Sequence, residues 1–170
     1  SKPAFWIIGS TTAEVSNKLF QNAAKSDHAY IRYNGNQMYT DLMGGRLNAV
    51  WAPMTTALAM VRQNQARIVA ITGPRRLPQL PNVPTISETF PDVVVDSWSG
   101  FFVPAATPRP IVQLLHGHVM AVLADPEVME RQRADGNQLM KLTPEQSDEY
   151  VRNDFPKWER LLRVAGIEPQ

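Results

Sequence analysis

Residues 4–14, which read AFWIIGSTTAE, decide the fold class of this sequence. Ala4 to Ile8 form a short apolar run that stops at a glycine, a pattern typical of a buried strand. Thr11 and Glu14 follow with the spacing of a capping box, which predicts a helix that starts near Thr11. A buried strand that leads directly into a capped helix is the repeating unit of α/β proteins.

The alternation of strand and helix continues along the first 72 residues. Further strands are expected at 29–33, 47–52 and 67–72, and further helices at 37–43 and 54–64. Four strands joined by three helices predict a parallel sheet with helices on its faces. The fold class expected from the sequence is therefore α/β.

The pattern changes after residue 72. Residues 73–85 read GPRRLPQLPNVPT and contain four prolines, so they form neither a regular helix nor a central strand. A long strand, or two strands that meet near residues 97–100, is expected within 93–103. Capping signals at Thr107, Asp125 and Thr143 then predict a mainly helical end of the chain.

Composition excludes several classes of protein. The chain has 170 residues, 44% of them hydrophobic, and its 17 basic and 16 acidic side chains give a net charge of +1. This balance gives no electrostatic reason to expect nucleic acid as a partner. The lack of cysteine excludes disulfides, thiolate metal sites and a cysteine nucleophile. No uncharged stretch reaches the ~20 residues that a membrane-spanning helix needs.

The sequence offers no catalytic constellation. It contains no recognisable triad and no metal-ligand spacing, and the residues around Ser99 do not form a nucleophile elbow. His116 and His118 are two positions apart, so they point to nearly opposite sides of a helix and cannot easily share a metal. We therefore predict no catalytic residue, no metal and no cofactor.

Polar residues follow each of the first three predicted strands. The carboxyl ends of parallel strands lie at one edge of a sheet, where ligands of open α/β sheets bind. Backbone N–H groups at helix starts favour an anion there, although each loop also reads as an ordinary turn or helix cap. The candidate ligand-binding residues are Ser10, Thr11, Thr12, Tyr33, Asn34, Gly35, Pro53 and Thr55.

Short motifs occur in a fixed order over nearly the whole chain. They include LMGGRL at 42–47, LPNVPT at 80–85, PAATP at 104–108 and TPE at 143–145. This order resembles the Bug-type extracytoplasmic solute receptors of tripartite tricarboxylate transport systems. The resemblance implies the fold of a type II periplasmic binding protein, in which two α/β lobes close on a small ligand.

The resemblance also implies an organisation and a function. Residues 4–97 would form the second lobe, and residues 98–170 would cross back and supply C-terminal helices to the other lobe, most of which this chain lacks. The receptor would bind a small carboxylate and present it to membrane transporter subunits, without catalysis. Its location would be periplasmic, although Ser1-Lys2-Pro3 shows no signal peptide, which leaves a cytosolic protein or a removed leader open.

Two other functions remain open on the residues alone. One is an α/β enzyme that acts on a small carboxylated or phosphorylated substrate, and the other is a ligand-free sensor or interaction protein.

The apolar residues of the helices after Thr107 need a partner if the other lobe is missing, so we expect a homodimer. These residues are Ile111, Val112, Leu114, Leu115, Val119, Val122, Leu123, Trp158, Leu161 and Leu162.

Overall fold

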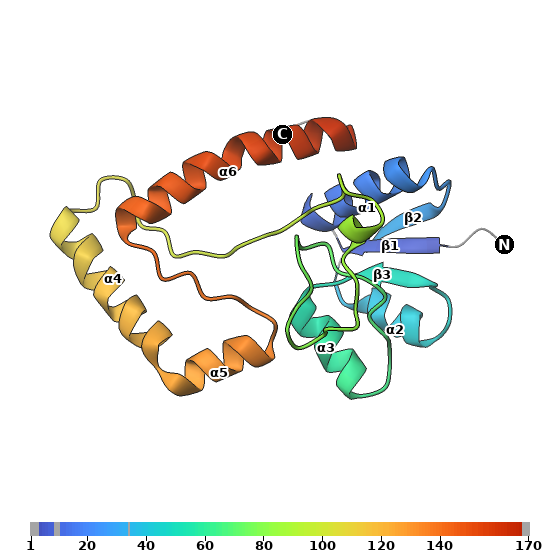
Figure 1. The fold of residues 1–170 in the computed structure, drawn as a ribbon, viewed down its shortest axis with the longest axis horizontal. Helices are drawn as coiled ribbons and strands as arrows, with labels where there is room; N and C mark the ends of the chain where they lie inside the picture. Colours follow the sequence, from blue (N-terminus) through green and yellow to red (C-terminus); the bar gives the residue numbers. More distant parts are fainter. Residues whose placement is uncertain (1–3, 9–10, 34, 168–170) are drawn as a thin grey trace. The chain divides into compact units, whose positions relative to one another are not determined.

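The computed structural model describes residues 4–8, 11–33 and 35–167. The chain divides into two compact units (Figure 1). The first comprises Ser1–Ser97 with Arg160–Gln170, and the second comprises Trp98–Glu159.

The first unit contains a parallel sheet of three strands in the order β2-β1-β3. The strands are β1 (Ala4–Ile8), β2 (Ala29–Tyr33) and β3 (Ala49–Trp51). Ile8 lies opposite Tyr33, and Ile7 lies opposite Trp51. The carboxyl ends of the three strands therefore meet at one edge of the sheet, as the alternating pattern predicted.

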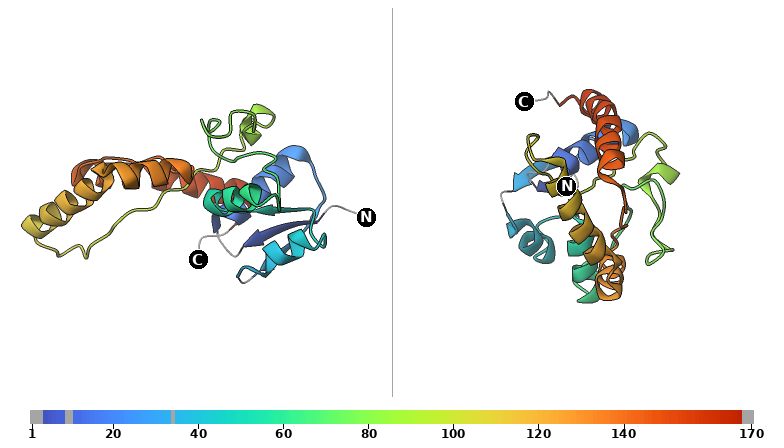
Figure 2. Two further views of the ribbon diagram at one scale, coloured as in Figure 1. Left: turned by 90° about the horizontal axis from the view of Figure 1, so that it is seen from below. Right: turned by 90° about the vertical axis from the view of Figure 1, so that its left-hand side faces the viewer.

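Three helices connect and follow these strands: α1 (Thr11–Ala24), α2 (Gln37–Met43) and α3 (Met54–Arg62). From the central strand β1 the chain passes through α1 to β2 at one edge of the sheet. It then returns through α2 to β3 at the other edge. Crossovers between parallel strands are right-handed, and these two crossovers run across the sheet in opposite directions. The helices α1 and α2 that they contain are therefore placed on opposite faces of the sheet. Figure 2 shows α2 on the face of the sheet away from α1.

The core of the first unit lies between the sheet and its helices. Val15 and Leu19 of α1 are buried at helical spacing. Met38 of α2 is fully buried against Leu47, and Tyr33 packs against this pair. The buried apolar residues of α1 and α2 thus face the sheet side of the first unit.

The predicted fourth strand, 67–72, is not formed in the described structure. Ile71 makes only an isolated parallel bridge with Thr85, through hydrogen bonds of 3.1 and 2.9 Å. A strand needs a continuing ladder, and the facing segment contains prolines that have no N–H to donate. The strand predicted within 93–103 is also wrong, because Val95 N donates to Thr72 O without a further ladder.

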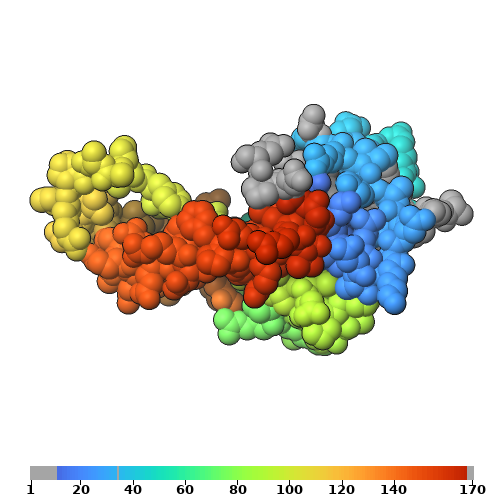
Figure 3. Space-filling view, turned by 90° about the horizontal axis from the view of Figure 1, so that it is seen from above, coloured from blue at the N-terminus to red at the C-terminus, as the bar shows by residue number. Residues whose placement is uncertain are grey.

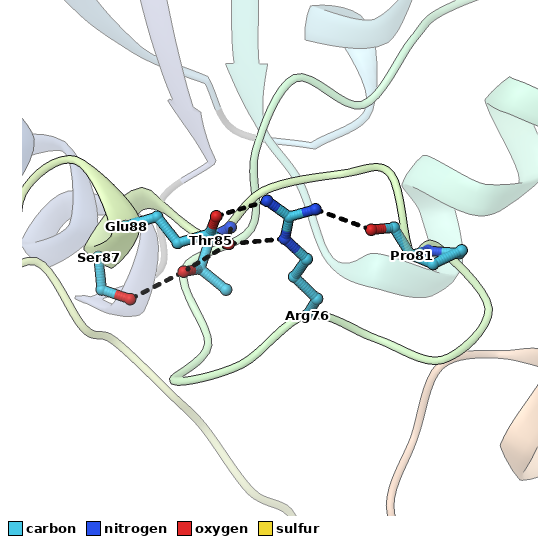
Figure 4. Close-up of polar contacts among 5 residues, drawn as sticks. All are labelled: Arg76, Pro81, Thr85, Ser87 and Glu88. Carbon is cyan, nitrogen blue, oxygen red and sulfur yellow. Dashed lines mark hydrogen bonds and ion pairs between the residues drawn. The ribbon is translucent and has the colours of Figure 1, made fainter.

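The proline-rich segment is held by one arginine (Figure 4). Arg76 donates to both carboxylate oxygens of Glu88, at 2.8 and 2.5 Å, and to the carbonyl of Pro81 at 2.9 Å. Thr85 and Glu88 form the predicted capping box around the short 3-10 helix η1 (Ile86–Glu88). The hydrogen bonds from Arg76 and Thr85 lower the pKa of Glu88 to about 2.

The second unit is mainly helical, as predicted. It contains α4 (Arg109–Ala124), α5 (Pro126–Ala134) and most of α6 (Pro144–Ala165). Asp125 caps α5, and Thr143 exchanges hydrogen bonds with Gln146 in the predicted capping box. The residue at the N-cap of α4 is Pro108 rather than the predicted Thr107, with proline in the first turn.

Apolar side chains are exposed on the second unit. Ile111, Leu114, Leu115 and Val122 of α4 are 44–60% exposed, and no residue of α4 or α5 is buried. Figure 3 shows the surface of α6 in orange to red. Of the helices in the described ranges, none has the length and apolar character needed to cross a membrane.

Candidate ligand-binding site

The carboxyl edge of the sheet carries the predicted ligand residues. Loops leave this edge after β1, β2 and β3, and α1 and α3 begin within three residues of their strands. Each helix start presents backbone N–H groups without helical partners, together with the positive end of the helix dipole. Ser10 and Asn34 lie outside the described residues.

The loop after β1 leads directly into α1. Thr11 is exposed and is already helical, so the predicted box of Thr11 and Glu14 does not form in that way. Thr12 is half-buried, and its carbonyl accepts from the Ser16 hydroxyl at 2.8 Å. The Glu14 carboxylate instead accepts a hydrogen bond from Arg32 of β2, which places an ion pair beside this loop.

The last residue of β2 is a tyrosine whose hydroxyl is engaged in a hydrogen bond. Tyr33 donates to Asp41 Oδ2 at 2.6 Å, and Arg46 donates to Asp41 Oδ1 at 2.6 Å. These hydrogen bonds lower the pKa of Asp41, and the bond to Asp41 raises the pKa of Tyr33. Gly35 is exposed with φ +98°, a left-handed conformation that favours glycine.

The loop after β3 leads into α3. Pro53 is exposed and serves as the N-cap of α3, and it makes no side-chain hydrogen bond to the helix. The first turn of α3 has no acidic side chain. Thr55 is exposed in this turn. A carboxylate at this helix start would therefore meet backbone donors and a hydroxyl without competition from a capping side chain.

A buried polar network ties α1 to the strands beneath the edge. Asn17 Oδ1 accepts from Trp51 Nε1 and pairs with His28 Nε2, both at 3.0 Å. Asn17 donates to Gln21 at 3.1 Å, and Gln21 donates to the carbonyl of His28 at 2.9 Å. Because Asn17 Oδ1 only accepts, His28 carries its proton on Nε2 and accepts from Ser26 at Nδ1, 2.9 Å away.

This network makes the stability of the first unit sensitive to pH. Burial lowers the pKa of His28, and the nearby Asp27 opposes this effect. The folded state thus favours neutral imidazole, so its stability is full above the unfolded pKa of ~6.5 and falls as pH drops through the folded pKa. We expect the urea midpoint of the wild type to fall between about pH 7.5 and pH 5.5 and that of His28→Gln to fall less.

The matched control is His118→Gln, because His118 is exposed on α4. This variant is expected to keep the pH dependence of the wild type. Equal slopes for His28→Gln and the wild type would contradict the prediction.

Metal clusters and surface hollows are the alternatives to the strand-end loops as sites. Within the described ranges, no cluster of His, Asp or Glu could hold a metal. Hollows of about 510 and 260 Å³ open on the second unit, and none of the predicted ligand residues lines either one. The larger hollow lies along α5 beside Met129 and Arg133. The strand-end loops therefore remain the candidate site.

Comparison with known proteins decides the family. A model described as the tripartite tricarboxylate transporter family receptor matches residues 5–167. The chain belongs to this receptor family. This confirms the predicted family, which is a family of receptors.

Two curated relatives of this receptor are similar over most of its length. Protein BugT of Bordetella pertussis is 28% identical over 158 residues, which cover 92% of this chain and 48% of BugT. A protein of Pseudomonas sp. strain P51, named for the tcbD-tcbE intergenic region, is 27% identical over 155 residues, covering 89% of this chain and 46% of the relative. The chain spans about half the length of these relatives.

Solved structures confirm the α/β fold of the receptor. R. palustris Rpa4515, solved with adipate, matches with a TM-score of 0.85 and 25% identity, over 99% of this chain and 58% of that one. The periplasmic binding protein BugD matches with a TM-score of 0.81 and 25% identity, over 98% of this chain and 58% of that one.

Sequence reasoning missed the charged pair beside the first loop of this receptor. Arg32 and Glu14 are 18 residues apart in sequence, and only the pairing of β1 with β2 brings them together. It also missed Asn17, which is fully buried. A polar residue on the apolar face of α1, between Val15 and Leu19, was the available signal.

Proposed function

We propose that this chain is part of a periplasmic receptor that binds a small organic carboxylate and presents it to membrane transporter subunits, without chemical conversion. The observation that carries the proposal is the family match over residues 5–167. The similarity to a protein solved with the dicarboxylate adipate supports it further.

The proposed ligand contacts are the strand-end residues. Ser10, Thr11 and Thr12 would meet the ligand after β1, Tyr33, Asn34 and Gly35 after β2, and Pro53 and Thr55 after β3. The uncapped start of α3 supports this assignment, because its N–H groups favour an anion. The hydroxyl of Tyr33 is bonded to Asp41, so Tyr33 would contact the ligand through its backbone or ring.

The length of the relatives, about twice that of this chain, supports a proposed organisation in two lobes. Residues 4–97 would form the second lobe of the receptor, and residues 98–170 would serve the other lobe. The exposed apolar side of α4 supports this division, because α4 and α5 bury no residue within the described chain. In this chain alone, the same surface would instead be covered by a second copy.

Thr55→Ala is expected to weaken adipate binding to the complete receptor, measured by isothermal titration calorimetry. A hydrogen bond to a charged group contributes about 1.5–3 kcal/mol, so the loss is roughly tenfold or more in Kd. Thr11→Ala tests the neighbouring loop in the same way.

Thr40→Ala is the matched control, because Thr40 is exposed on α2, away from the helix start. It is expected to leave the affinity unchanged. Unchanged affinity in both Thr55→Ala and Thr11→Ala would refute the assigned contacts. A wild-type receptor that binds none of adipate, malate and succinate would refute the proposed function itself.

A further inference from the structure

The chain passes between the two units at two places. The first passage is Ser97–Trp98, and the second is Glu159–Arg160 within α6. A tryptophan lies beside each passage on the side of the second unit: Trp98 at the first and Trp158 next to the second. Any motion of one unit against the other must take place through the backbone near these two passages.

One carboxylate oxygen joins these two tryptophans. Asp154 Oδ2 accepts from Trp98 Nε1 at 2.8 Å and from Trp158 Nε1 at 3.0 Å. Its other oxygen, Oδ1, pairs with Lys157 Nζ at 3.3 Å, and the Asp154 side chain is only 10% exposed. Asp154 thus links the backbone segment that enters the second unit to the helix that leaves it.

The negative charge of Asp154 strengthens the hydrogen bonds of this link. Burial acts to raise the pKa of Asp154, but hydrogen bonds from Trp98 and Lys157 outweigh it, so the pKa is lowered. The carboxylate therefore stays ionised near neutral pH, and charge-assisted hydrogen bonds are stronger than neutral ones.

The link spans the turn of α6 that contains a proline. Pro156 lies inside this helix, and it has no N–H to donate to the carbonyl of Arg152. A missing bond of this kind lets a helix bend. The hydrogen bond from the Trp158 side chain to Asp154 spans the same helical turn. It therefore resists bending at the turn where Pro156 leaves out a backbone hydrogen bond.

Aromatic contacts also attach Trp98 to its surroundings. The ring of Trp98 meets Tyr150 edge-on at 5.8 Å between centroids, and it lies 6.1 Å from Phe102. Tyr150 is one helical turn before Asp154, so α6 contacts both the ring and the N–H of Trp98. The first passage is therefore attached to the helix that forms the second one.

We propose that Asp154 is a positioning residue of a hinge: by holding Trp98 and Trp158 together across Pro156, it couples the two passages and limits the motion between the units. The three residues are named the Asp154 clasp. Its role goes beyond the proposed function and does not depend on which ligand is bound.

The test measures the spread of distances between the units. The chain has no cysteine, so Gln63→Cys in the first unit and Arg131→Cys in the second, both exposed, accept one spin label each. With the labelled chain diluted into an excess of unlabelled chain, pulsed electron paramagnetic resonance then gives the distance distribution within one chain. Trp98→Phe keeps the ring and removes its N–H, and we expect it to broaden the distribution.

Two substitutions at Asp154 separate the hydrogen bonds from the side-chain volume. Asp154→Leu removes the acceptor and is expected to broaden the distribution. Asp154→Asn keeps one acceptor oxygen without the charge, and it is expected to broaden the distribution less than Asp154→Leu. Circular dichroism confirms that each variant is folded, and if Asp154→Leu unfolds, Trp98→Phe decides alone.

The matched control is Trp51→Phe. It removes an indole hydrogen bond of 3.0 Å, to Asn17, that lies entirely within the first unit. This variant is expected to lose stability without broadening the distribution. Wild-type width in Trp98→Phe, or equal broadening in Trp51→Phe, would overturn the role of the Asp154 clasp.

Discussion

Asn17→Leu is expected to destabilise the first unit by several kilocalories per mole. Leucine has the branching and the number of side-chain heavy atoms of asparagine but accepts no hydrogen bond. Trp51 Nε1 and His28 Nε2 would then lose their shared acceptor. Each buried donor left unpaired costs about 1–3 kcal/mol, so for the two donors we expect a loss of roughly 2–6 kcal/mol. Urea unfolding at pH 7.5, followed by circular dichroism, measures it.

Asn22→Leu is the matched control on the same helix. Asn22 is exposed and makes one hydrogen bond, to the carbonyl of Val164 at 3.2 Å. Its replacement is expected to cost less than about 1 kcal/mol, because water can take over an exposed bond. Equal losses in the two variants would show that the buried network contributes nothing beyond one surface hydrogen bond.

Light scattering of this chain at micromolar concentration is expected to give the mass of two chains. The side chains of Ile111, Leu114, Leu115 and Val122 lie along one side of α4 and are 44–60% exposed. Burying each of them completely would contribute about 1.5–3 kcal/mol relative to full exposure. An apolar stripe of this kind favours a two-fold contact with the same surface of a second copy.

Leu114→Glu combined with Val122→Glu is expected to return the mass to that of one chain, because a two-fold contact would bring the new charges together. Val69→Glu is the control, since Val69 is 70% exposed in the first unit. It is expected to keep the dimer mass. A wild-type chain that has the mass of a monomer and melts cooperatively would rule out the homodimer.

Local pattern was enough to predict most of the helices and strands. The bounds of β1, β2 and α2 follow from an apolar run that stops at a glycine or an Asn-Gly turn, and from a glycine pair after Met43. Caps and terminal glycines act within one turn, so these boundaries can be read from neighbouring residues. The predicted strand at 67–72 failed because strand formation depends on a partner segment that lies elsewhere in the chain.

The candidate site was only partly accessible to the same reasoning. The rule that loops follow the carboxyl ends of parallel strands located Thr11, Gly35 and Thr55 at one edge. This rule did not predict the hydrogen bond from the Tyr33 hydroxyl to Asp41. That bond depends on how α2 packs on the sheet, which no motif encodes.

The sequence by itself determined the α/β class, the helical end of the chain and the receptor family, because periodicity, caps and short motifs are local properties. Only the tertiary structure decided which distant polar groups meet: Asn17 with His28 and Trp51, and Asp154 with Trp98. The physical reason is that these hydrogen bonds join residues up to 56 positions apart. Their geometry exists only after the elements have packed and excluded water from the groups between them.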